Sequence, residues 1–428
     1  MSGDLTDSGG IPRDCTRLAA AAAVALLISA ARPALAASNF SPYATFGYEH
    51  DSNIFLAPSD AADLAPAGIT GLGDSILDYK AGLSSEMDFG PDSFTLDGSA
   101  TRDQYDRFSY LSHYEYLLDA NLHWQLTRVV EATFLYDQSR YMPSFTYTLT
   151  TALLLDTDRM ADVAVRVLVT PEWRLDLTPV VHEVTTPLPG FSDFKLVEKT
   201  GVVGIDYLGL GRLTAGLQFT DDIGRYEEIA DATRYTQHEF DFTANYRVSG
   251  FSTFSANAGY TSRNSEVNPA DSVPVPVGLG DVAGYAGIVG KTSGATGSLT
   301  YARQITGKTS ATLSIFRRVD SYIAGANPEI GTGGTVGLTW KADPKFTLGL
   351  TGGFTRDQIK GGLIEAEEAG AFNRTDNTKT AGFEVRYLAL SWLTVRPYVS
   401  WAKASSSFAL GNYSVTIFGI DVTGRLRW

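Results

Sequence analysis

The amino-acid sequence predicts an all-β fold, a transmembrane antiparallel β-barrel of about 18 strands, with 16 as the alternative count. Segments of about ten residues with alternating apolar and polar side chains recur along the chain and reach its last residue. Short and long connections alternate between them. The chain also has 42 glycines, 22 phenylalanines and 21 tyrosines, with a mean hydropathy of −0.05. This composition is typical of a closed sheet with an apolar outer band and a wet interior.

The amino-terminal segment predicts a signal peptide. Two arginines precede an apolar run from Leu18 to Ala30, and Ala34-Leu35-Ala36 provides the small residues that a signal peptidase requires. We therefore predict a signal peptide at residues 1–36 and an outer-membrane barrel at residues 37–428. No later apolar run approaches the about 20 residues of a spanning helix, so the mature chain would enter a membrane as strands.

The strands are predicted from the alternation of side chains. In Leu118–Leu126, Ala161–Val169, Glu239–Arg247 and Phe346–Thr355, every second residue is apolar, or is a glycine in an otherwise apolar set. Successive side chains of a strand point to opposite faces of a sheet. Each segment therefore has one face suited to lipid and a second, more polar face.

The lengths of the connections predict which end of the barrel faces the periplasm and which faces the outside of the cell. Tight links are predicted at residues 90–92, 127–128, 170–172, 209–211, 249–250, 306–308 and 342–344. Longer links are predicted at residues 51–73, 140–157, 186–196, 222–234, 263–283, 319–333 and 357–377. Two further short outer loops are predicted near residues 108–113 and 404–411, which brings the count to about 18 strands. Outer-membrane barrels have short periplasmic turns and longer outer loops. The Gly-rich residues 279–293 fit either a loop or a strand, and they decide between 18 and 16 strands.

The closing strand carries a predicted assembly signal. Its lipid-facing residues are Phe418, Ile420, Val422, Leu426 and the terminal Trp428. Bacterial outer-membrane barrels close on such an amphipathic strand. We therefore expect this strand to be recognised by the barrel-assembly machinery, and the mature barrel to have outer-membrane lipid as its surroundings.

Aromatic residues near the predicted turns suggest a periplasmic interfacial girdle. The alternative is the general enrichment of aromatic residues in strands. The residues assigned to the girdle are Tyr43, Phe94, Trp124, Trp173, Phe254, Trp340, Phe346, Trp392 and Trp428.

The polar faces define a predicted lumen lined by both signs of charge. The lumen-lining candidates are Asp97, Asp119, His123, Asp162, Arg166, Arg174, Asp176, Glu239, Asp241, Arg247, Glu384, Arg386, Arg396 and Arg425. They could form charge ladders in a hydrated passage, or they could simply pair across neighbouring strands and hold the wall in register. The net charge of −14 argues against a nucleic-acid partner, which would require a basic surface.

Catalytic and metal-binding motifs are absent from the sequence. None of the five histidines belongs to an HExxH pair, and there is no GxSxG elbow. The sequence therefore predicts no enzyme, no cofactor and no metal ligand. His50-Asp51-Ser52-Asn53 could hold a cation at a loop mouth, but an Asx turn at the end of the first strand accounts for the same residues.

Two passages carry a family resemblance. PYATFGYEHDSNIF (residues 42–55) and SFTLDGSATRDQYDRFSYLSHYEYLLDANLHWQLT (residues 93–127) resemble the β-barrel porin family that includes outer-membrane proteins associated with exopolysaccharide biosynthesis and export. The chain departs from that family at Leu56, where an arginine is expected, and at Trp428, where phenylalanine is commoner. The resemblance implies a transport or export role, with polysaccharide and periplasmic export components as partners.

The sequence thus predicts a porin-like conduit for exopolysaccharide or a similar hydrophilic solute. The alternative is a closed or loop-plugged barrel that acts as a surface-binding or structural protein, with an outer-membrane enzyme as a distant third. Inward-folded loops at residues 51–73 and 263–283 would favour the closed barrel.

Overall fold

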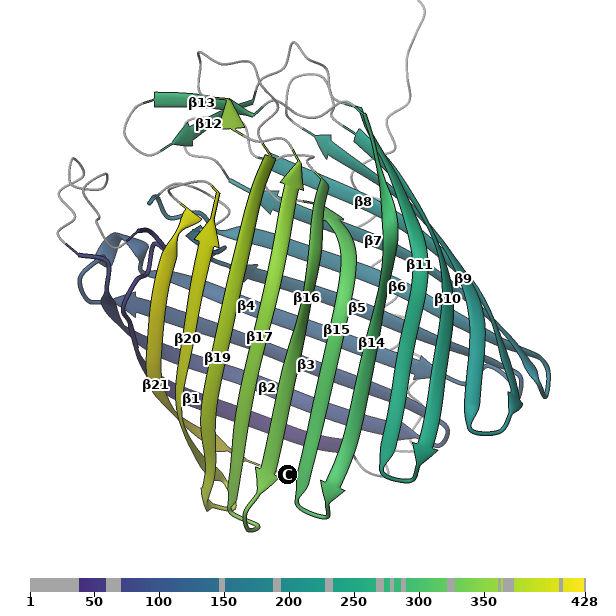
Figure 1. Cartoon of the computed structure of the whole chain (residues 1–428). Helices are drawn as coiled ribbons and strands as arrows, with labels where there is room; N and C mark the ends of the chain where they lie inside the picture. Colours follow the sequence, from purple (N-terminus) through teal and green to yellow (C-terminus); the bar gives the residue numbers. More distant parts are fainter. Residues whose placement is uncertain are drawn as a thin grey trace, which may run out of the picture.

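The computed structural model of the protein is a single closed barrel of 18 antiparallel strands (Figure 1). The structure describes residues 38–58, 71–145, 151–187, 194–227, 234–266, 273–277, 281–285, 290–321, 328–360, 363–364, 373–407 and 411–426. The predicted signal peptide, its cleavage after Ala36, and Trp428 lie outside these residues.

Each barrel strand pairs with the barrel strands that come before and after it in the chain, and β21 returns to pair with β1 and closes the sheet. The strands are β1 Ser38–Asp51, β2 Asp74–Phe89, β3 Asp92–Tyr105, β4 His113–Trp124, β5 Val130–Tyr141, β6 Asp156–Thr170, β7 Trp173–Thr186, β8 Phe194–Leu210, β9 Leu213–Glu227, β10 Arg234–Ser249, β11 Ser252–Glu266, β14 Gly290–Thr306, β15 Thr309–Ser321, β16 Pro328–Lys341, β17 Phe346–Lys360, β19 Asn373–Leu390, β20 Leu393–Ser406 and β21 Tyr413–Arg425.

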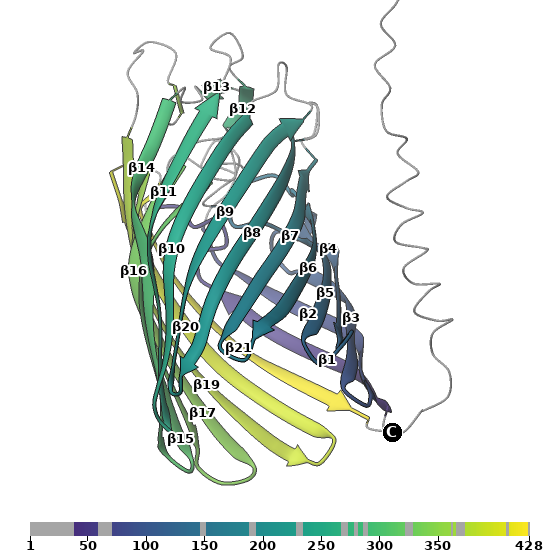
Figure 2. The same ribbon diagram turned by 90° about the vertical axis from the view of Figure 1, so that its right-hand side faces the viewer.

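A second, three-stranded sheet lies at the end of the barrel that carries the longer connections (Figures 1 and 2). It consists of β12 (Val273–Val277), β13 (Asp281–Tyr285) and β18 (Leu363–Ile364). Part of the Gly-rich stretch 279–293 thus belongs to this sheet, and β14 begins at Gly290. The predicted count of 18 barrel strands is confirmed, and the alternative of 16 is wrong.

The outer surface of the barrel is apolar. On β21, Phe418 and Ile420 are 49% and 41% exposed, and similar exposed residues recur on most other strands. No helix among the described residues is long and apolar enough to cross a membrane. A closed sheet satisfies all backbone hydrogen bonds within itself, which a lipid environment demands. The protein is an integral protein of the bacterial outer membrane.

The strands extend further toward the outside than the sequence predicted. The loop predicted at 222–234 is shorter, because β9 continues to Glu227 and β10 begins at Arg234. Likewise β17 continues to Lys360 and β19 begins at Asn373. A strand needs only about 9–11 residues to cross the hydrocarbon. The change to polar residues therefore marks the edge of the membrane, whereas backbone pairing continues beyond it.

Tyr43, which was assigned to the aromatic girdle, faces the lumen instead. Tyr43 donates a hydrogen bond to Asp97 Oδ1 at 3.2 Å, and the Arg425 guanidinium lies 4.9 Å from its ring centroid. Gly82 on β2 makes room for the ring, since a Cβ there would lie 2.4 Å from Tyr43 Cζ. The prediction for Tyr43 was wrong because the girdle was assigned by distance from the turns, whereas the alternation along β1 places Tyr43 on the same face as Thr45 and Glu49. Trp124, Trp173 and Trp340 are 45%, 43% and 48% exposed.

A similar contact between a glycine and a tyrosine gives a stability prediction. A Cβ at Gly224 would lie 2.0 Å from Cε1 of Tyr235, which is paired with it across β9 and β10. Gly224→Ala must displace this buried ring, and we expect it to cost about 1–3 kcal/mol of unfolding free energy. Gly201→Ala on β8 is the matched control, because nothing lies within 4 Å of its Cβ position. Urea unfolding in detergent measures both variants, and equal losses would contradict this account.

Candidate site in the barrel lumen

A cavity of about 780 Å³ lies against one side of the barrel wall. Its lining comes from β19, β20, β21, β1, β2, β3 and β4, which are consecutive in the sheet. A cavity shared by this arc lies on its concave side, so it belongs to the lumen. The charged side chains that line it are Glu49, Asp78, Lys80, Asp103, Glu115, Arg386, Arg396, Asp421 and Arg425.

A ladder of alternating charges crosses the wall beside this cavity. Arg396 Nε donates to Asp421 Oδ2 at 2.9 Å, and Arg396 Nη1 lies 3.5 Å from Glu384 Oε2. Arg386 Nη2 lies 3.5 Å from the other oxygen of Glu384. Next to the ladder, Tyr398 donates a hydrogen bond to Glu49. The candidates Glu384, Arg386 and Arg396 are thus brought together, while Arg425 lines the same cavity beside Tyr43.

A second ladder joins β5, β6, β7 and β8. Arg166 lies 3.4 Å from Glu131 and 3.5 Å from Asp176. Arg174 lies 3.1 Å from Asp176 and also pairs with Asp206. The arginines alternate with the acids across the strands, so the structure supports cross-strand pairing for Arg166, Arg174 and Asp176.

Among the described residues, the remaining acidic candidates on β3 to β6 have other neighbours than arginine. Asp97 accepts the hydrogen bond from Tyr43, and Asp119 lies opposite it in the β3–β4 register. Asp137 of β5 lies opposite Asp119, which makes a row of three acids. Asp162 lies on β6 and shares its face of that strand with Ala164 and Arg166. His123 Nδ1 lies 3.5 Å from Thr133 Oγ1.

The candidates on β10 lie on the far side of the barrel from the cavity. Glu239 accepts a hydrogen bond from Thr296 at 3.3 Å, and Asp241 is 4% exposed. Arg247 lies with Arg303 in a shallow pocket beside the turn between β10 and β11. The structure therefore separates these three residues from the charged cavity.

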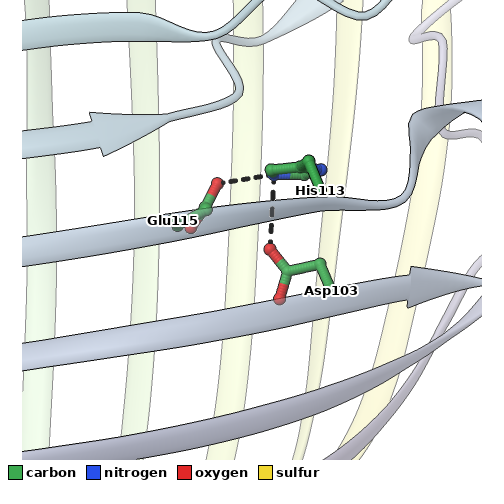
Figure 3. A group of neighbouring side chains, drawn as sticks. All are labelled: Asp103, His113 and Glu115. Carbon is green, nitrogen blue, oxygen red and sulfur yellow. Dashed lines mark hydrogen bonds and ion pairs between the residues drawn. The ribbon is translucent and has the colours of Figure 1, made fainter.

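A cluster that sequence reasoning missed lies at the outer end of the cavity (Figure 3). His113 Nε2 lies 3.0 Å from Glu115 Oε1 and 3.4 Å from Asp103 Oδ2, and His113 is 4% exposed. His113 and Glu115 alternate with Tyr114 on β4, so they share a face. That alternation was visible in the sequence, but the pairing with Asp103 depends on the register between β3 and β4.

A cluster of buried hydrophobic residues lies at the outer mouth on the same side. We call Ile54, Phe55, Ile76, Tyr105, Phe108, Leu111 and Phe145 the mouth cluster. Ile76 and Tyr105 also line the lumen cavity, so the cluster lies on the lumen side of the wall. The Phe55 ring centroid lies 4.8 Å from that of Phe108 and 5.0 Å from that of Phe145. The described part of the predicted loop 51–73 therefore folds inward, whereas loop 263–283 is described only in part.

The base of this loop is held by an Asx turn. Asp51 Oδ1 accepts a hydrogen bond from the backbone N–H of Asn53 at 2.6 Å. The Asn53 side-chain amide donates to Ala57 O at 2.8 Å and to Ser414 O at 3.1 Å. The predicted Asx turn is confirmed, and it occupies the groups that a cation at this position would need. Leu56, which follows in this loop, adopts a left-handed conformation with φ of 48°.

Neither a protein family nor a curated protein matches the sequence. Among solved structures, the chain is similar in shape to OpdL of Pseudomonas aeruginosa, with 11% identity, a TM-score of 0.43, and coverage of 91% of this chain and 99% of that chain. OpdK of the same organism, solved with vanillate, gives 13% identity, a TM-score of 0.44 and the same coverage. The FrpB iron transporter of Neisseria meningitidis gives 11% identity and a TM-score of 0.49 over 86% of this chain. The chain spans only 62% of the length of FrpB.

Proposed function

We propose that the protein is a conduit for a hydrophilic solute across the outer membrane, and that its substrate is an exopolysaccharide or a fragment of one. The observation that carries the proposal is the lumen cavity, whose wall alternates guanidinium and carboxylate groups along β19, β20 and β21. Donors and acceptors placed in this way can replace the water around a hydroxyl-rich solute without binding it irreversibly.

The aromatic residues of the cavity support a sugar as the solute. Tyr43 and Tyr398 line it together with the charged groups. A tyrosine presents a flat apolar face and a polar hydroxyl. It can therefore pack against the C–H face of a sugar ring while neighbouring charged side chains hydrogen-bond the hydroxyls. The sequence resemblance in residues 42–55 and 93–127 points to the same class of substrate, with periplasmic export components as partners.

A second function is favoured by the mouth cluster. Phe55, Phe108 and Phe145 belong to three different outer connections and pack together over inward-facing residues. Loops that fold inward can plug a wide barrel. A barrel kept closed by this cluster would act as a gated exporter or as a surface-binding protein.

Liposome swelling distinguishes these functions. Liposomes that contain the refolded protein are placed in isotonic neutral, anionic or cationic oligosaccharides of increasing length. We expect swelling with small sugars, a sharp size limit, and different rates for the two signs of charge. Protein-free liposomes are the control for leakage. An absence of swelling with every sugar, in a protein shown to be folded by heat-modifiable gel migration, would contradict the open conduit and leave the closed barrel.

A further inference from the structure

We propose that Asp103, His113 and Glu115 form a binding site for one divalent transition-metal ion of the zinc class. The site lies where the outer end of β3 meets the start of β4, beside the mouth cluster (Figure 3). It goes beyond the proposed conduit, since metal binding is independent of whether any solute passes through the lumen.

The distances suit a small metal ion. Zinc binds imidazole nitrogen and carboxylate oxygen at about 2.0–2.2 Å in a tetrahedral arrangement, which separates neighbouring ligand atoms by about 3.3–3.6 Å. Nε2 of His113 lies 3.0 Å from Glu115 Oε1 and 3.4 Å from Asp103 Oδ2, and the three ligand atoms all lie within 4.8 Å of one another. Small side-chain movements would bring all three to bonding distance, and a water molecule from the lumen cavity, which Asp103 and Glu115 line, would supply a fourth ligand.

The histidine is oriented as a metal ligand. Nδ1 of His113 lies 2.6 Å from the carbonyl oxygen of Leu111, so it carries the proton and donates to that carbonyl. A ligating histidine commonly donates its second ring N–H to a carbonyl or carboxylate, which fixes the ring and directs the other nitrogen at the metal. At His113 that other nitrogen, Nε2, faces the two carboxylates.

A third carboxyl group and a backbone N–H group also lie at the site. Asp78 of β2 lies directly opposite Asp103 and adds a third carboxyl group. Glu115 Oε1 also accepts a hydrogen bond from the backbone N–H of Met142 at 3.0 Å. Three carboxyl groups thus lie around one imidazole, and a divalent cation bound there would replace the protons that these acids share.

His182 shows the arrangement of a histidine that needs no metal. Its Nε2 lies 2.9 Å from Asp158 and its Nδ1 lies 2.7 Å from Glu198. The two acids lie on opposite edges of the ring, so an imidazolium satisfies both and a single ion cannot bridge them. At His113 both acids converge on one nitrogen. This difference makes His182 the matched control for His113.

A bound ion would also brace the mouth. Leu111 is fully buried in the mouth cluster and its carbonyl holds His113, while Met142, which packs against that cluster, is held by Glu115. The site therefore links the connection after β3 to the connection after β5, and we expect the ion to protect both connections from proteolysis.

The test is zinc binding to the purified protein after refolding in detergent and removal of metal by EDTA. We expect isothermal titration to show one Zn²⁺ bound per chain, Ca²⁺ to bind far more weakly because it requires six or more oxygen ligands, and Zn²⁺ to slow proteolysis at the mouth. His113→Gln should lose about 100-fold or more in Zn²⁺ affinity. Loss of a residue that only hydrogen-bonds a metal ligand costs about 10–100-fold, and loss of the ligand itself should cost at least as much. His182→Gln should retain wild-type affinity.

Two results would overturn the proposal. One is an absence of stoichiometric Zn²⁺ binding to the folded wild-type protein. The other is an equal loss of affinity in His113→Gln and His182→Gln, which would place the ion elsewhere or assign it to nonspecific binding. If His113→Gln does not reach the heat-modifiable folded form, Glu115→Gln replaces it, because that side chain is 30% exposed and its loss leaves His113 bonded to Leu111. Sugar flux is measured separately, so failure of the metal site leaves the conduit unaffected.

Discussion

Phe108→Ala is expected to open the outer mouth and to increase the conductance of the barrel. Phe108 is 5% exposed, and its ring packs edge to face on Phe55 at 4.8 Å. Its backbone N–H also donates to Asp74 Oδ2 at 2.8 Å. Replacing a buried phenylalanine by alanine costs about 3–5 kcal/mol. That loss falls on the mouth cluster, while the hydrogen-bonded wall keeps all of its strand pairings.

Single-channel recording measures this effect, with Phe251→Ala as the control. Phe251 lies in the turn between β10 and β11 and is 67% exposed, so the same chemical change there removes little packing. We expect Phe108→Ala to have open states of longer duration or higher conductance than the wild type, and Phe251→Ala to behave as the wild type. Unchanged conductance in a folded Phe108→Ala barrel would show that the mouth cluster does not restrict passage.

Arg396→Gln is expected to make passage more selective for cations. Arg396 pairs with both Asp421 and Glu384, and all three lie on the lumen side of the wall. Removal of the guanidinium leaves two uncompensated carboxylates beside the cavity. One unit charge at 4 Å in water contributes about 1 kcal/mol, which corresponds to about a fivefold change in the ratio of cation to anion permeability.

Reversal potentials in a salt gradient give this ratio, and Arg159→Gln is the matched control. Arg159 pairs with Glu183 at 3.2 Å, but it shares its face of β6 with the lipid-facing Ala161 and Val163. Loss of that pair should leave selectivity unchanged. Equal shifts in the two variants, or no shift in Arg396→Gln, would mean that the ladder beside the cavity does not border the path of ions.

The fold could be predicted from the sequence because alternation is a local property. Phe418 and Ile420 face lipid as the pattern of the last strand indicates, and every barrel strand pairs with the barrel strands that come before and after it in the chain. Tyr43 was assigned to the girdle by its distance from the turn, although alternation along β1 places it on the lumen face with Thr45 and Glu49, where Gly82 leaves room for its ring.

The candidate site was less predictable, because register rather than alternation decides it. Arg166 and Asp176 could be assigned to a polar face, but their pairing follows from the offset between β6 and β7. Asp103 and His113 are ten positions apart in the sequence and meet only because a short connection returns the chain in that register. The mouth cluster lay beyond prediction altogether, since Phe55, Phe108 and Phe145 come from connections that the sequence marks only as loops.

Single-channel conductance of the wild-type barrel in a planar bilayer tests the conduit most directly. Oligosaccharides of increasing size and of either charge are added as blockers. The account predicts stable conductance that particular sugars reduce, with a larger conductance in Phe108→Ala. An absence of conductance in both proteins, each shown to be folded by its heat-modifiable migration, would contradict a conduit and indicate a barrel that binds partners without passing solute.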